Sequence, residues 1–467
     1  MVFSSLIFLF AYLPLTLLCY YIVPKAWKNA VLFLFSLLFY AWGEPIYLFL
    51  MIASITCAYL FGLLIERYKK TDRKKAGRVM IASVTLTLSF LIFFKYYHFV
   101  ADNLSLLPGI GLPKLAWLTL PIGISFYTFQ IISYTVDVYR DECAAQKNYV
   151  AFGTYVTLFP QLIAGPIVRY SDVDRDLCDR RETVMLFSEG AVRFTCGLAK
   201  KVLLGDMLAA GYEYYKGLSL FAPTALGAWM TVILFSLHLY YDFSGYSDMA
   251  IGLGKMFGFR FPENFNYPYI SRSITEFWRR WHITLSTWFR EYVYVPLGGN
   301  RRGKGRQYFN LAVVWLLTGL WHGASWNFLL WGIYYCVLLI VEKAFLFRLL
   351  KRMPAFVGHF YTLFLVVIGF LIFSYTDFTQ GINCFEALFG IGCQGFSHAT
   401  ATYQFLRLLP LVCIAAVGAT PLPKRCFARL TKGNHGILLS IFCGIAILLS
   451  VAYLVDSTYS PFAYTQF

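Results

Sequence analysis

Long apolar runs, each close to the length of a bilayer crossing, follow one another along most of the chain. A membrane-spanning helix needs about 20 mainly apolar residues. Such runs lie near residues 3–23, 29–50, 52–65, 79–97, 117–136, 149–166, 186–209, 222–241, 309–346, 356–375, 404–420 and 436–455. The run over 309–346 is long enough for two elements, and the shorter runs can be tilted or re-entrant. The pattern predicts an all-α, polytopic membrane protein with about 11–13 membrane helices, short and re-entrant ones included.

The composition supports this class and excludes several others. Of the 467 residues, 59% are apolar and 14% are charged, and the mean hydropathy is +0.60. Ordinary globular domains are about 45–50% apolar and about 25% charged. A soluble fold of this size could not bury so much apolar surface, and disordered, collagenous, coiled-coil and nucleic-acid-binding proteins have different compositions. The first apolar run has no basic residue before it, so we expect a retained span and not a cleaved signal.

The basic residues predict how the helices are oriented. The net charge is +16, and Lys and Arg cluster between the apolar runs, as they do in cytoplasmic loops. The clusters are ERYKKTDRKKAGR over 66–78, NRRGKGR over 300–306, the pair Lys351 and Arg352, and residues 424–432. The loop over 376–403 contains no Lys or Arg. We therefore expect the N-terminus and the C-terminus to lie outside the cytoplasm.

The middle of the chain differs from its two ends. Residues 1–114 and 346–467 read as apolar spans joined by loops, whereas 115–345 carries polar side chains in apolar surroundings. These are Gln130, Asp137, Gln161, Arg169, Asp242, Asp248, His282, Asn310, His322 and Asn327. Polar residues inside a membrane are costly, and each is a candidate for function. We expect N-terminal helices over 1–114, a functional core over 115–345 and C-terminal helices over 346–467.

Two histidines stand out in that core. His322 lies in LLTGLWHGASWNFLLWG, where small residues let backbones approach and tryptophans surround the ring. His282 lies in SITEFWRRWHITLSTWFREY, in which Ser273 and Glu276 form a predicted capping box. We expect a helix to begin there and to end by Pro296. Its polar residues make it unsuited to lipid, so we expect it to line a cavity filled by water or substrate.

A pair of buried histidines suits general base catalysis on a hydroxyl, because burial keeps the imidazole neutral. The turn near 298–306 should return the chain, so that 309–321 brings His322 to the depth of His282. Both rings should then face one cavity and lie within about 15 Å of each other, since both must reach one reacting centre. The alternatives are packing histidines, and a helix over 274–295 that lies in the membrane interface.

Other chemistries have little support. The sequence has no Walker A motif, no G-x-S-x-G elbow and no H-E-x-x-H. His282, His322 and Asp242 match no standard metal spacing, so no metal is expected. Cys384 and Cys393 share a polar loop, and whether they pair is left open.

Several long motifs resemble the membrane-bound O-acyltransferase family, and within it the alginate O-acetyltransferase-like branch. They are PIGISFYTFQIISYTVDVYR, LFPQLIAGPIVRY, YYDFSGYSDMAIGLGKMFGFRFPENFNYPYI, FWRRWHITLSTWFREYVYVPLGGNRRG and LLTGLWHGASWNFLLWG. They occur in the same order as in the family and cover about residues 115–345. The resemblance implies a ring of helices around a central cavity that spans the bilayer.

The resemblance also implies site residues. His322 matches the near-invariant histidine of the family and would take the proton of the acceptor hydroxyl. His282 matches a second conserved polar position, asparagine in many eukaryotic members, and would position the donor carbonyl or assist proton transfer. Asn327 or a backbone N–H near Gly323 would stabilise the oxyanion. Expected cavity-lining residues are Trp281, Trp321, Trp326, Asp242 and Arg279. Arg301, Arg302, Lys304 and Arg306 would guide the donor, or would only orient the protein.

The function that the resemblance implies is O-acetylation of an exported polysaccharide such as alginate. The acetyl group would come from a cytoplasmic thioester, acetyl-CoA, with no bound cofactor. A separate extracytoplasmic SGNH-type acetyltransferase or esterase is the expected partner, together with membrane lipid, in the bacterial cytoplasmic membrane. Nucleic acid is not an expected partner. The alternatives are D-alanyl transfer to teichoic acid from a carrier protein, and a transporter or channel without chemistry.

Overall fold

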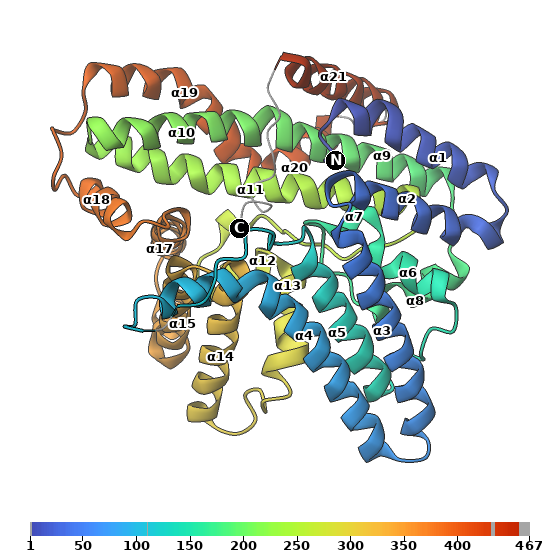
Figure 1. Ribbon diagram of the computed structural model, residues 1–467. Helices are drawn as coiled ribbons and strands as arrows, with labels where there is room; N and C mark the ends of the chain where they lie inside the picture. The colour runs from blue at the N-terminus through green and yellow to red at the C-terminus, as the bar shows by residue number, and fades with distance from the viewer. Residues whose placement is uncertain (1, 110, 431–434, 457–467) are drawn as a thin grey trace. The chain divides into compact units, whose positions relative to one another are not determined.

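The computed structural model describes residues 2–109, 111–430 and 435–456. All regular secondary structure within these residues is helical, which confirms the predicted all-α class (Figure 1). Contacts divide the chain into two units, one of residues 1–194 and 246–263 and one of residues 195–245 and 264–467. The three successive regions expected from the sequence stay a prediction.

The first unit is built on a long helical hairpin. Its helices are α1 (Leu13–Ile22), α2 (Lys28–Gly43), α3 (Tyr47–Lys69), α4 (Arg73–Leu104), α5 (Ile124–Arg140), α6 (Tyr149–Thr157), α7 (Phe159–Leu162) and α8 (Tyr170–Asp179). Helices α3 and α4 pack against each other, and α5 packs against both (Figure 1). Helices α9 (Val184–Ala199) and α11 (Ala225–Met256) contribute residues to both units.

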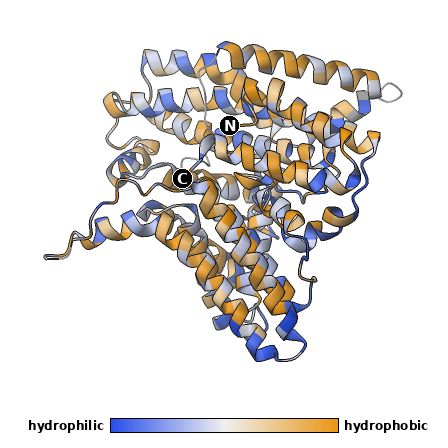
Figure 2. Cartoon of the chain, turned by 45° about the vertical axis from the view of Figure 1, so that its right-hand side comes forward, coloured by the Kyte–Doolittle hydropathy of each residue, from blue (hydrophilic) through white to orange (hydrophobic). Residues whose placement is uncertain are grey.

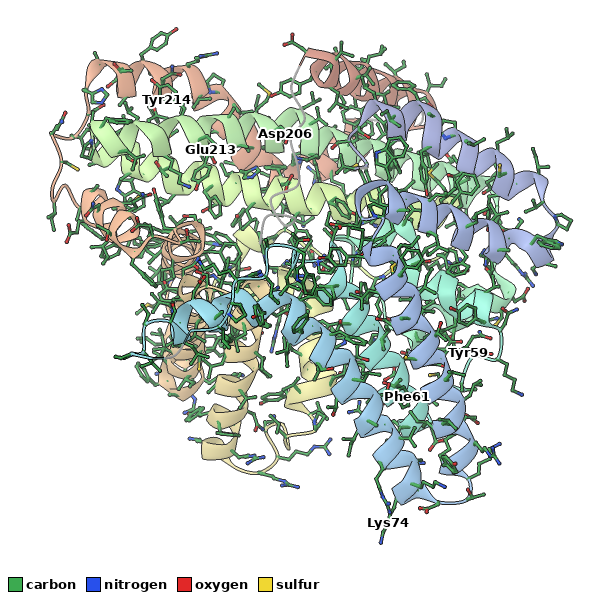
Figure 3. All side chains as sticks on the ribbon, in the orientation of Figure 1. Tyr59, Phe61, Lys74, Asp206, Glu213 and Tyr214 are labelled. Carbon is green, nitrogen blue, oxygen red and sulfur yellow. The ribbon has the colours of Figure 1, made fainter. Side chains whose placement is uncertain are left out.

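The tip of the α3–α4 hairpin carries the strongest basic cluster of the sequence. Figure 2 shows a hydrophilic tip at the end of two largely hydrophobic helices. Lys74 lies at this tip, with its side chain directed away from the helices (Figure 3). The Asp72 side chain caps α4 by accepting a hydrogen bond of 2.9 Å from the Lys75 N–H. The charge pattern along α3 and α4 is therefore that of two membrane helices joined by a basic loop.

The second unit contains the remaining helices. They are α10 (Asp206–Phe221), α12 (Ile274–Arg280), α13 (Ile283–Phe289), α14 (Lys304–His322), α15 (Trp326–Val341), α16 (Phe347–Leu350), α17 (Ala355–Ser374), α18 (Phe378–Leu388), α19 (Ala399–Gly418), α20 (Leu422–Leu430) and α21 (His435–Asp456). The expected division of 309–346 into two elements is confirmed by α14 and α15. Cys384 and Cys393, whose pairing the sequence left open, both carry free thiols.

Six helices among the described residues are long and apolar enough to cross a membrane. They are Tyr47–Lys69, Arg73–Leu104, Trp326–Leu350, Ala355–Ser374, Ala399–Gly418 and Gly436–Asp456, and a shorter apolar helix covers Phe8–Ile22. A multi-pass membrane protein is thereby confirmed. The expected number of 11–13 includes short and re-entrant elements, so that number stays a prediction.

Helices α14 and α15 pack at unusually short range. A Cβ atom on Gly319 would overlap the Phe328 carbonyl oxygen, and one on Gly332 would come within 2.5 Å of the Trp315 carbonyl oxygen. Only glycine leaves room for this approach, in which the two backbones touch. The pair α14–α15 forms the support on which His322 is carried.

A buried carboxylate joins the end of α15 to the start of α12. Glu342 is 1% exposed and accepts hydrogen bonds from the Ile274 N–H at 2.6 Å and from the Thr275 N–H at 2.8 Å. The Ser273 hydroxyl also accepts from the Glu276 N–H at 3.0 Å, which confirms the predicted helix start. An anion at a helix N-terminus satisfies unpaired N–H groups and opposes the helix dipole. Helix α12 is thus fixed in position at its first turn.

Candidate functional site

The predicted helix from Ser273 to Pro296 is interrupted at His282. Helix α12 ends at Arg280, α13 begins at Ile283, and His282 has a φ of +44°, in the left-handed region. This conformation costs about 1–3 kcal/mol for a residue with a side chain. The prediction of one continuous helix was therefore wrong. No glycine or proline marks the break in the sequence, so local signals could not reveal it.

Two backbone hydrogen bonds hold this break against the preceding irregular segment. The Asn266 N–H donates to the Arg280 carbonyl at 2.9 Å, and the Ile283 N–H donates to the Asn264 carbonyl at 2.9 Å. We call residues 264–267 and 280–283 the His282 turn. The segment before it, rich in Pro, Asn and aromatic residues, was expected to pack as an irregular loop, and here it fixes the position of His282.

Asn264 determines the protonation pattern of the His282 ring. Its side chain is fully buried, and its Oδ1 accepts from the Thr284 hydroxyl at 2.9 Å and lies 3.0 Å from His282 Nδ1. An amide oxygen can only accept, so Nδ1 carries the proton and Nε2 carries the lone pair. No motif in the sequence analysis selected Asn264. The only signal was its place in the irregular segment before His282.

The His282 ring is neutral over the physiological pH range. Its side chain is 1% exposed, and it lies outside the membrane-spanning helices, since α12 and α13 have seven residues each. Burial lowers the pKa of His282 to about 3, because the charged ring would lose its hydration. A neutral ring with a lone pair on Nε2 is a hydrogen-bond acceptor and a weak base.

His322 is placed in a different way, as the last residue of the regular helix α14. Its ring centroid lies 4.9 Å from that of Trp331, 5.2 Å from that of Phe373 and 5.0 Å from that of Trp321. The next residue is Gly323, where a Cβ atom would overlap the Phe328 ring. The Trp and Gly residues that flank His322 in the sequence thus form its surroundings.

Both histidines lie beside Trp321. The Trp321 ring centroid is 5.9 Å from that of His282 and 5.0 Å from that of His322. The two imidazoles can therefore be no further apart than the sum of these distances, which is inside the expected limit of about 15 Å. The structure brings the pair together, while their catalytic roles and the cavity between them stay predictions.

The other residues expected to line the cavity differ in their placement. Trp281 is buried and stacks on Phe277, at 5.6 Å between ring centroids. Trp326, in contrast, is 49% exposed, and Arg279 is also exposed. Of the expected tryptophans, Trp321 contacts both histidine rings, and Trp281 is buried next to His282 in the sequence.

Asn327 and Asp242 both take part in structural contacts. Asn327 is buried and its side-chain amide donates to the Phe373 carbonyl at 3.0 Å, which ties α15 to the end of α17. Asp242 forms an ion pair of 2.7 Å with Lys201, whose side chain is fully buried. Lys201 also pairs with Asp206 at 2.5 Å. Roles of Asn327 with the oxyanion and of Asp242 with substrate stay predictions.

The basic segment over 300–306 is partly helical and fully exposed. Arg301 and Arg302 lie in a turn, whereas Lys304 and Arg306 belong to the first turns of α14. The Arg306 guanidinium donates to the Leu297 carbonyl at 3.0 Å. This contact closes the turn before α14, and the expected role in donor guidance stays a prediction.

The fold and the site together define a helical, multi-pass membrane protein with two buried histidines at one tryptophan. Comparison with known proteins makes this class specific. The sequence model of the membrane-bound O-acyltransferase family matches residues 144–382. The chain belongs to this family, and it is an O-acyltransferase.

Three relatives illustrate the similarity. A probable alginate O-acetylase of Pseudomonas aeruginosa is 44% identical over 85% of this chain and 76% of its own length. A probable alginate O-acetylase of Pseudomonas putida is 39% identical over the full length of both proteins. A peptidoglycan O-acetyltransferase of Helicobacter pylori is 34% identical over 85% of this chain and 81% of its own length.

Proposed function

We propose that this protein transfers an acetyl group from a cytoplasmic thioester for the O-acetylation of an exported polysaccharide. Relatives named for the O-acetylation of alginate and of peptidoglycan support the acetyl group and the kind of acceptor. The observation that carries the chemistry is the placement of two buried imidazoles beside the Trp321 ring. Alginate is the first candidate acceptor.

His322 acts as the general base. It takes the proton of the acceptor hydroxyl as the oxygen attacks the thioester carbonyl, forming the C–O bond and a tetrahedral intermediate. Collapse of the intermediate breaks the C–S bond, and the proton held by His322 passes to the leaving thiolate. A base in this position typically contributes about 10²–10⁴-fold to the rate.

His282 assists through its lone pair. Because Nδ1–H is directed to Asn264, Nε2 can accept a hydrogen bond but cannot donate one to the donor carbonyl. Of the two roles expected for His282, this favours assistance in proton transfer over contact with the carbonyl oxygen. Asn264 is then the residue that positions His282.

The donor, partner and membrane belong to the same proposal. We take the donor to be acetyl-CoA and the partner to be a separate extracytoplasmic SGNH-type acetyltransferase or esterase. We also propose that the protein lies in the bacterial cytoplasmic membrane with both termini outside the cytoplasm. The basic tip of the α3–α4 hairpin supports this orientation, because basic loops are retained in the cytoplasm.

The test combines purified protein with a deletion strain. Purified protein in nanodiscs should consume labelled acetyl-CoA, and a His322→Ala variant should not. The polysaccharide of the deletion strain should lose its acetyl esters and regain them on complementation. If the deletion strain loses D-alanyl esters instead, the protein carries out the carrier-dependent reaction. If the deletion strain keeps its esters and the purified protein does not consume acetyl-CoA, the protein is a transporter. Either result would overturn the proposal.

A further inference from the structure

A basic cavity lies against the His282 turn. Its volume is about 500 Å³, within the range of small-molecule sites. Its lining residues are Asn266, Tyr267, Ile270, Arg280, Pro421, Lys424 and Arg425. All of them belong to the second unit of the chain, which also contains both histidines.

The cavity presents three cationic side chains, Arg280, Lys424 and Arg425. Arg280 is held in place, since its guanidinium pairs with Glu276 at 2.9 Å and donates to the Asn266 carbonyl at 3.1 Å. Lys424 and Arg425 are exposed at the start of α20. One carboxylate against three cations leaves an excess of positive charge. Guanidinium and ammonium groups arranged in this way are suited to phosphate.

The cavity and the His282 site are formed by the same two stretches of backbone. Asn266 lines the cavity and is two residues from Asn264, and Arg280 lines it and is two residues from His282. Tyr267, also in the lining, has a φ of +47°. Strained residues persist where the surrounding structure enforces them, commonly at functional sites. A ligand in the cavity would therefore contact the same turn that positions His282.

Part of this cavity lies outside the family match. The match covers residues 144–382, whereas Pro421, Lys424 and Arg425 follow it. The sequence suggested only an orienting role for the basic cluster over 424–432, and it suggested 300–306 for donor guidance. The structure places Lys424 and Arg425 beside Arg280.

We propose that this cavity binds the phosphate groups of the acyl donor, a thioester of the coenzyme A type, and that Arg280, Lys424 and Arg425 are its contacts. The proposal rests on the proposed function. Phosphate binding in the cavity would direct the thioester end of the donor toward the His282 turn. An anionic lipid headgroup offers the same phosphate chemistry, so the test must separate the two sources.

The test compares two donors with the same thioester. Acetyl-CoA carries phosphates, whereas S-acetylpantetheine lacks the phosphates and the adenosine to which they are attached. For Lys424→Gln/Arg425→Gln, we expect the KM of acetyl-CoA to rise about tenfold, because charge-assisted contacts to phosphate are lost. The KM of S-acetylpantetheine should stay at the wild-type value.

The matched control is Lys70→Gln/Lys74→Gln, which removes the same charge from the exposed tip of the α3–α4 hairpin and should leave both KM values unchanged. An equal rise for both donors, or the same rise in the control, would overturn the proposal.

The lipid source is tested by repeating the measurement in nanodiscs of phosphatidylcholine alone and with phosphatidylglycerol. The difference in the KM of acetyl-CoA between Lys424→Gln/Arg425→Gln and the wild type should persist without anionic lipid. If it vanishes there, the cavity holds a lipid headgroup and the proposal is wrong.

A binding measurement separates this proposal from the proposed function. Desulfo-CoA has the phosphates but cannot carry an acetyl group, and its affinity is measured by titration of the purified protein. Affinity that falls about tenfold in Lys424→Gln/Arg425→Gln supports the cavity even if acetyl-CoA is not turned over. Unchanged affinity overturns the cavity even if acetyl-CoA is a donor.

Discussion

His322 and His282 lie at the same tryptophan, but the chain places them by opposite means. His322 ends a regular helix of 19 residues and is surrounded by aromatic rings, among them residues close to it in sequence. His282 lies in a break between two short helices, in a left-handed conformation, and depends on Asn264, which is 18 residues earlier. One ring is positioned by a helix and the other by a strained turn with a buried amide.

Because the two histidines are held differently, substitutions at the two positions should have different consequences. A substitution of His322 leaves the helix intact and removes a chemical group. A substitution of His282 also alters a turn whose conformation few residues accept. Asparagine is among the side chains that tolerate the left-handed region. This gives a physical reason for the expectation, drawn from the family resemblance, that asparagine takes the corresponding position in many eukaryotic members.

The largest expected effect is that of His322→Ala. Turnover at saturating donor should fall by about 10²–10⁴-fold, because the general base is lost. Expression and the melting temperature should stay near those of the wild type, since helix α14 tolerates alanine at its end. Both are measured on the purified protein, and near-normal turnover would remove His322 from the mechanism.

The next prediction distinguishes the chemical role of the His282 ring from the conformational role of residue 282 in the turn. His282→Ala should lower kcat by about 10–100-fold, less than His322→Ala, because His282 only assists proton transfer. His282→Asn should be milder, since it restores a side chain that accepts the left-handed conformation. A more severe defect in His282→Asn than in His282→Ala would contradict the positional argument.

Asn264→Asp tests the assignment of the His282 proton. A carboxylate beside Nδ1 favours the charged ring and raises the pKa of His282 from its depressed value of about 3. The neutral ring, and with it the activity, is then lost below the new pKa, so the acid limb of kcat/KM should move to higher pH. In a His282→Asn background the shift should disappear. A shift that persists there would show that Asn264 acts on another group.

The smallest expected effect is that of Thr284→Val. This nearly isosteric change removes one of the hydrogen bonds to Asn264 Oδ1 and should cost about 0.5–1.5 kcal/mol of stability. Thermal unfolding measures this loss, and the pH profile should keep its wild-type limbs, because the Asn264–His282 contact remains. A displaced acid limb in this variant would make Thr284 part of the proton assignment.

Much of the fold could be predicted because local signals agreed with the final structure. The apolar runs near 52–65, 79–97, 356–375, 404–420 and 436–455 coincide with candidate spans. Ser273 marked the start of α12, and the 309–346 run resolved into α14 and α15. These features depend on residues close in sequence. The place of His322 at the end of α14 belongs to the same group.

The parts that could not be predicted depend on contacts between distant segments. The break at His282 exists because Asn264 and its neighbours hold the turn open, and no residue at 280–283 indicates it. The exposure of Trp326 depends on which face of α15 packs inward. The basic cavity joins Arg280 to Lys424, which are 144 positions apart in the numbering of the chain. Each of these features is determined by tertiary contacts, which override the local sequence pattern or add to it.

The glycine-mediated packing of α14 on α15 bears on the order in which the protein is assembled. The two helices are joined by only three residues, 323–325, so their contacts are local and form quickly during synthesis. Trp321 and Trp331, two of the rings around His322, are already present in this hairpin. Phe373 can join them only when α17 has emerged. The surroundings of the proposed base thus begin as a helical hairpin, and later helices close around it.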